Sequence, residues 1–120
     1  MSDVPVEKLR ALCSALPEVE ERLSHGSNTW FIRGKKTFVM FVGFHHGDPN
    51  LAFWCAAGDG VQADLISENP EYFFRPPYVG HRGWVGVRLD TGIGWDEIGE
   101  LVEDAYRAVA PARLIAVLGG

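Results

Sequence analysis

The stretch TWFIRGKKTFVMFVGF, residues 29–44, decides the fold. Both of its ends are rich in β-branched and aromatic residues, which strands prefer, so it predicts strands over residues 29–33 and 36–44. Gly34-Lys35 between them has the composition of a tight turn. Because two strands joined by so short a turn run antiparallel, this hairpin is the centre of the predicted sheet.

The segments on either side of this hairpin complete an α+β pattern. Apolar periodicity, proline positions and capping residues predict helices over residues 5–16, 59–68 (capped by Asp59) and 95–109. Further strands are predicted over residues 51–56 and 84–89, and residues 18–24 can begin another. The aromatic and proline-rich run 72–78 is expected to be irregular, and residues 114–118 to form an edge strand or a flap over the core. We therefore predict one domain over residues 1–120, an antiparallel sheet with helices packed on one face.

Composition excludes several classes of protein. The 120 residues carry 11 Lys and Arg against 16 Asp and Glu, so the net charge of −5 excludes binding of nucleic acid by overall positive charge. Cys13 and Cys55 are too few for a disulfide scaffold, lie in apolar runs and are expected to be buried in a cytoplasmic protein. The apolar runs are shorter than the roughly 20 residues of a membrane helix, so we expect no membrane association.

The charge is unevenly distributed along the chain. Residues 22–47 and 72–89 contain seven of the basic residues, all four histidines and ten of the 14 aromatics, with no Asp or Glu. The rest of the chain carries four basic and 16 acidic side chains. The two parts therefore have charges of +7 and −12, which predicts a basic sheet with its loops and acidic helices.

Five segments, in this order, resemble the MmcQ/YjbR family of small proteins: Leu16-Pro17-Glu18-Val19-Glu20-Glu21, Gly34-Lys35-Lys36-Thr37-Phe38, Asn69-Pro70-Glu71-Tyr72-Phe73, Pro76-Pro77-Tyr78-Val79-Gly80-His81-Arg82-Gly83-Trp84-Val85 and Ala105-Tyr106. The resemblance spans about a hundred residues and rests on their order and spacing, with Ala105 where many members have serine. It implies a frataxin-like (CyaY-like) fold and DNA binding through a sheet similar to a double-wing domain.

The basic, aromatic segments supply candidates for weak DNA binding. The candidate phosphate contacts are Arg33, Lys35, Lys36, Arg75 and Arg82. The candidates for stacking on bases, provided that they are exposed, are Trp30, Tyr78 and Trp84. Lys35 and Lys36 in one loop and Arg82 in another would act as two wings against a duplex.

An alternative function is a non-catalytic module that binds a small anion or a protein through a pocket near Tyr78, His81 and Arg82, because Gly80 and Gly83 can present the last two on a tight loop. Two metal sites are weaker alternatives. One is the acidic face of the last helix, with Asp96, Glu100, Glu103 and Asp104, and the other is His45-His46 with Asp48. No nucleotide-binding or catalytic motif occurs, so we expect no enzyme activity and no cofactor, and we expect a monomer.

Overall fold

The computed structural model describes residues 5–24, 26–42 and 51–119. Within these residues the helices are α1 (Pro5–Ser14), α2 (Val61–Glu68), the 3-10 helix η1 (Gly80–Arg82), α3 (Trp95–Val109) and α4 (Ala112–Val117). The strands are β1 (Val19–Ser24), β2 (Ser27–Ile32), β3 (Lys36–Val42), β4 (Ala52–Cys55), β5 (Phe73–Phe74) and β6 (Val85–Arg88). The chain is therefore α+β, as predicted.

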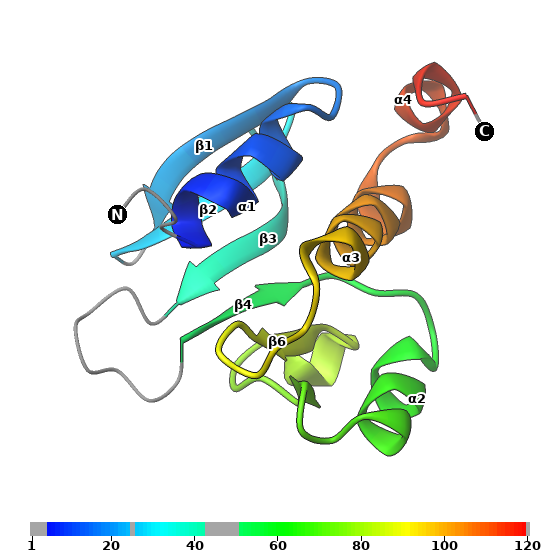
Figure 1. Ribbon diagram of the computed structural model, residues 1–120. Coiled ribbons are helices and arrows are strands. Elements are labelled where there is room, and N and C mark those ends of the chain that lie inside the picture. The colour runs from blue at the N-terminus through cyan, green and yellow to red at the C-terminus, as the bar shows by residue number, and fades with distance from the viewer. Residues whose placement is uncertain (1–4, 25, 43–50, 120) are drawn as a thin grey trace.

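The described strands form one sheet of six, in the order β1-β2-β3-β4-β6-β5, and every pair is antiparallel. Figure 1 shows α1 and α3 in front of this sheet, and α2 beside the half that holds β5 and β6. The prediction that helices cover one face is thus confirmed for α1 and α3. The other face, which we call the open face, lies away from α1 and α3.

Cross-strand pairing assigns side chains to the two faces, because paired residues point to the same side of a sheet. The row Trp30, Val39, Cys55 and Val85 is buried and faces the helices. The neighbouring row contains Thr29, Met40, Trp54 and Gly86 and faces the open side, where Met40 and Trp54 are half-buried. The core therefore lies between the sheet and α1 with α3.

A register shift between β2 and β3 leaves Phe38 as an extra residue of β3, so that Phe38 and Val39 are both buried. The ring of Phe38 meets the edge of Tyr106 on α3, with centroids 5.6 Å apart. Tyr106 is fully buried, and its hydroxyl donates to the carbonyl of Pro17 at 2.7 Å. One side chain thereby connects α3 with β3 and with the α1–β1 turn.

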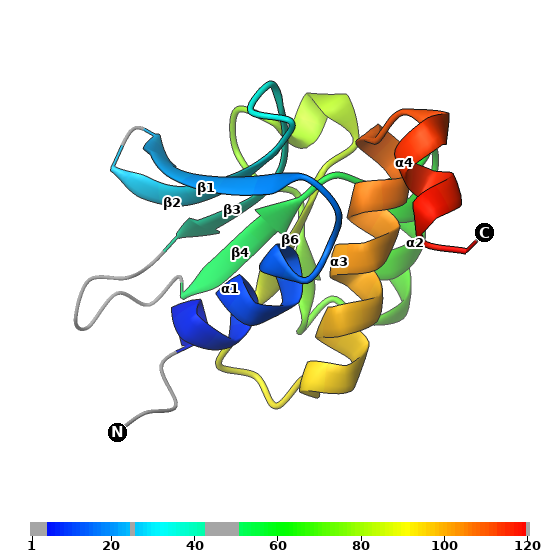
Figure 2. The same cartoon turned by 90° about the horizontal axis from the view of Figure 1, so that it is seen from above.

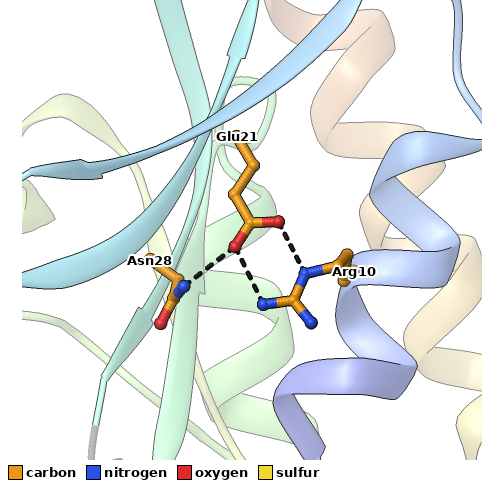
Figure 3. Close-up of polar contacts among 3 residues, drawn as sticks. All are labelled: Arg10, Glu21 and Asn28. Atoms are coloured by element: carbon orange, nitrogen blue, oxygen red, sulfur yellow. Dashed lines mark hydrogen bonds and ion pairs between the residues drawn. The ribbon is translucent and has the colours of Figure 1, made fainter.

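A polar contact holds α1 against β1 (Figure 3). The Arg10 guanidinium donates from Nε and Nη2 to the two carboxylate oxygens of Glu21 at 2.6 and 3.0 Å, and Asn28 Nδ2 donates to the same carboxylate at 2.8 Å. These hydrogen bonds, that from Arg10 above all, hold the pKa of Glu21 below its ordinary value. The pair fixes the helix to the end of the sheet where β1 and β2 lie.

Three local predictions need correction. Asp59 does not cap α2, since the N-cap is Gly60 in the left-handed conformation (φ 81°), which glycine adopts without strain. Residues 114–118 belong to helix α4 and the turn after it instead of an edge strand, and buried Leu114 attaches this helix to the core. Phe73–Phe74 forms the short strand β5 inside the run expected to be irregular.

One predicted metal site and the membrane prediction are left to report. The metal site predicted at His45, His46 and Asp48 lies outside the described residues. Among the described helices, none is long and apolar enough to cross a membrane.

We predict that Glu21→Gln lowers the free energy of unfolding by about 1 kcal/mol at neutral pH, because it removes a charged, two-pronged hydrogen bond to Arg10. The lowered pKa means that this contribution is present above the ordinary carboxylate pKa and is lost as the pH falls through the folded value. The free energies of unfolding of the two proteins, measured with urea, should therefore converge as the pH falls below the lowered pKa of Glu21. Glu68→Gln on α2, an exposed carboxylate that takes no part in this contact, is the control, and a difference that persists undiminished in acid would contradict the assignment.

Candidate functional site

The turn between β2 and β3 presents two lysines. Arg33 and Gly34 take left-handed conformations in succession (φ 57° and 69°), and the Lys35 amide donates to the Ile32 carbonyl. Non-glycine residues rarely adopt such angles, but the Arg33 amide donates to the Glu18 carbonyl at 2.8 Å and holds the turn. Lys35 and Lys36, which follow, are exposed.

A second loop presents Arg82. Gln62 on α2 donates from Nε2 to the carbonyls of Gly80 (2.9 Å) and Trp84, one at each end of the loop. The Arg82 guanidinium lies over the ring of Trp84, 5.4 Å from its centroid, which keeps the charge at the surface above an apolar base. The predicted tight loop is thus a 3-10 turn clamped by a neighbouring helix.

These two loops meet at one hollow of about 470 Å³, which we call the basic hollow. Its lining residues are Lys35, Lys36, Thr37, Arg82, Ala108 and Val109. Figure 2 shows the β2–β3 turn, η1 (yellow-green) and the α3–α4 junction along the same side of the molecule. Three cations separated by up to 47 positions in sequence therefore surround a single space, and none of the described residues that line it is acidic.

A second hollow of about 360 Å³ adjoins the same turn, where Arg33 joins Lys35 and Lys36 against residues 109–111. Arg33 is less available than the lysines, because its Nε lies 3.4 Å from the Glu18 carboxylate. Among the described residues, Lys35, Lys36 and Arg82 form no ion pair. The charge of the basic hollow is thus left for an external anion.

The other predicted phosphate contact, Arg75, lies outside the basic hollow. Its side chain covers Gly80, where an added Cβ would lie 2.6 Å from the Arg75 Cγ. It is exposed and lies beside the loop of Arg82 without lining the same space.

Two of the three predicted stacking residues are unavailable. Trp30 is fully buried and Trp84 is 3% exposed, because both rings belong to the hydrophobic core. Their assignment as base-stacking residues required exposure and is therefore wrong. Tyr78 meets that condition, with 85% of its surface exposed.

Among the hollows described by the residues below, none brings Tyr78, His81 and Arg82 together. Tyr78 lines a hollow of about 570 Å³ on the open face, whereas Arg82 lines the basic hollow and exposed His81 lines neither. The residues of the hollow on the open face, called the open-face hollow below, are Ser27, Met40, Val42, Trp54, Tyr78 and Val79. The alternative function therefore loses the convergence on which it rested.

The remaining candidates do not form a reactive site within the described residues. No group of three or more His, Cys, Asp or Glu side chains in the described part of the chain is placed to hold a metal, and on α3 Glu103 pairs with Arg107 at 2.9 Å. Cys13 and Cys55 are buried as predicted, and burial raises the pKa of the Cys55 thiol to about 12. Both thiols are therefore held in the unreactive, protonated form.

Comparison with known proteins decides the family. The YjbR family model matches residues 14–108. The chain belongs to the YjbR family. The part of this YjbR-family chain that matches contains the whole basic hollow apart from Val109. No curated protein matches the chain.

One solved structure is similar in fold to this YjbR-family chain. The crystal structure of the Deinococcus radiodurans protein DR2400, whose family-model domain is DUF419, is similar with a TM-score of 0.72 and 21% sequence identity. The match covers 84% of this chain and 75% of that chain. At this identity the likeness concerns the fold alone.

We predict that Gln62→Ala releases the loop that carries Arg82. Losing two hydrogen bonds to backbone carbonyls should lower the free energy of unfolding by about 1–2 kcal/mol. Amide hydrogen exchange should accelerate at Arg82 and Gly83, whose amides bond to the carbonyls of Val79 and Gly80. Ser67→Ala, an exposed change on the same helix, is the control, and unchanged exchange in the Gln62 variant would show that the clamp does not hold the loop.

Proposed function

We propose that this protein binds DNA weakly, with phosphate oxygens held in the basic hollow. The observation that carries the proposal is that Lys35, Lys36 and Arg82 line one space in which no described lining residue is acidic. Lysine and arginine bind phosphates through charge, arginine also through paired N–H donors, and the hydroxyl of Thr37 can add a hydrogen bond.

The arrangement also supports a two-loop mode of contact. The β2–β3 turn and the loop of η1 reach the hollow from different parts of the sheet. A phosphate backbone would therefore be contacted by Lys35 and Lys36 from one loop and by Arg82 from the other. Arg33 and Arg75 flank this grip and would contribute less, because Arg33 already pairs with Glu18 and Arg75 lies across Gly80. We extend the proposal to a double-wing mode of DNA binding on a frataxin-like (CyaY-like) topology, by a cytoplasmic, monomeric, non-enzymatic protein without a cofactor.

The overall charge of −5 sets the expected strength. The basic hollow is local, and the acidic helices repel the same phosphates at longer range, an effect that salt screens over about 10 Å at 0.1 M. Few phosphate contacts and a negative total charge predict weak binding, and its affinity should decrease further as the salt concentration rises.

We predict that Arg82→Gln and the pair Lys35→Ala with Lys36→Ala weaken binding to a short duplex at about 50 mM salt. Each lost contact should reduce the slope of log affinity against log salt by about one. Lys8→Ala removes one charge from α1, far from the hollow in sequence, and is the matched control. Fluorescence anisotropy with labelled duplex provides the measurement. Absence of binding by the unaltered protein at this salt, or equal losses in Lys8→Ala and Arg82→Gln, would refute the proposal.

A further inference from the structure

The open-face hollow lies over the middle of the sheet. Met40 on β3 and Trp54 on β4 are direct cross-strand partners and point away from the helix-side core. On one flank, the ring of Phe74 covers Gly86, where any Cβ would collide with it, and the Arg88 guanidinium lies over that ring at 4.8 Å. The β5–β6 flank is thus closed by the protein itself.

The opposite flank is closed in a similar way. The Arg22 guanidinium lies 4.0 Å from the centroid of Phe31 and donates from Nη2 to the Gly34 carbonyl at 2.9 Å. Between these two covered flanks, Met40 and Trp54 remain half-buried at the floor of a hollow of about 570 Å³. This volume falls in the range of small-molecule sites, and its lining is apolar and aromatic.

Tyr78 stands at the rim of this hollow in a constrained conformation. It follows Pro76-Pro77 and has φ 65°, an angle that costs a non-glycine residue about 1–2 kcal/mol. The Val79 amide donates to the Pro77 carbonyl at 2.6 Å and closes the turn around it. The turn keeps a large ring exposed beside Val79 and the hollow, where it is free to cover a planar group.

The lining of the open-face hollow matches a flat ring better than an ion. Among the described lining residues, two aromatic rings, a thioether and two valines supply apolar contact, the hydroxyls of Ser27 and Tyr78 supply hydrogen bonds, and no side chain is charged. Positive charge lies on both of its flanks, where Arg88 covers Phe74 and Arg22 covers Phe31. Arg82, four residues after Tyr78, lines the basic hollow.

The two hollows therefore suit two parts of one ligand. In a nucleotide, the flat base can stack on Trp54 and Tyr78. The negatively charged phosphate can pair with Arg82, which forms no ion pair among the described residues. Figure 2 places η1, which follows Tyr78, on the side of the sheet opposite α1, the same side as the β2–β3 turn. In a duplex the bases are stacked inside and cannot enter the open-face hollow.

We propose that the open-face hollow takes an unpaired base of single-stranded nucleic acid, stacked against Tyr78 and Trp54. This inference rests on the proposed phosphate binding and makes single strands the preferred ligand over duplex.

The test compares ligands of equal length, of which the two single strands also carry equal charge. Anisotropy is measured at about 50 mM salt with a thymidine strand of about 12 nucleotides, an abasic strand of the same length and a duplex of that length. Base stacking should make the thymidine strand bind about fivefold or more tightly than the abasic strand. The duplex should follow the abasic strand.

Variants locate the effect. Tyr78→Gly removes the ring and tolerates the positive φ, so the fold is retained, and affinity for the thymidine strand should fall to that for the abasic strand. Tyr78→Phe keeps the ring and the same backbone constraint, and should keep the preference for the thymidine strand over the abasic strand. Trp54→Leu keeps an apolar side chain at the floor but removes the stacking surface, and should reduce this preference. Lys35→Ala with Lys36→Ala should weaken binding of all three ligands together.

Each outcome separates the two proposals. Equal affinity for thymidine and abasic strands, beside salt-dependent binding of both, would overturn base stacking and leave phosphate binding intact. A preference for single strands that survives in Tyr78→Gly and Trp54→Leu would overturn the assignment to this hollow. Thymidine monophosphate that competes as well as the strand would assign the hollow to a free nucleotide instead. Absence of binding to every ligand would overturn both proposals.

Discussion

The contact between Phe38 and Tyr106 is the constraint on which the arrangement of the molecule depends. It places α3 across the sheet, and the Tyr106 hydroxyl bond to Pro17 fixes the turn between α1 and β1 to the same helix. Ala108 and Val109, which line the basic hollow, follow Tyr106 by two and three residues. The wall opposite Lys36 and Arg82 is therefore positioned by the core, and a change in how α3 seats on β3 would move the charged loops relative to it.

Much of the fold follows from local sequence, and the reasons are visible element by element. The helix Trp95–Val109 matches its prediction at both ends, because its apolar stripe is long and its first turn is acidic. The hairpin is also as expected, and in its turn the left-handed residues are Arg33 and Gly34, with the Arg33 amide bonded to the Glu18 carbonyl. The end of the chain was misjudged because five apolar residues in a row fit a strand or a helix equally well.

Some residues of the candidate site could be predicted from the sequence, and others could not. Lys35, Lys36 and Arg82 could be chosen from the chain because they lie in acid-free loops, and the fold does bring them to one hollow. The burial of Trp30 and Trp84 could not be read from their neighbours, since either face of an aromatic-rich strand can turn inward. Gln62 carries no local signal at all, because its partners lie 18 and 22 residues away and become neighbours only when α2 docks.

The two outer strands of the sheet have a consequence for how copies of the chain meet. β5 consists of two residues, and β1 carries Glu20, Glu21 and Arg22 in succession. A strand at the rim of a sheet has unpaired amides and carbonyls, and another chain can add to them when that rim is long, flat and apolar. Here one rim is two residues long, and the other exposes the charged side chains of Glu20 and Arg22, features that disfavour the addition of a further strand.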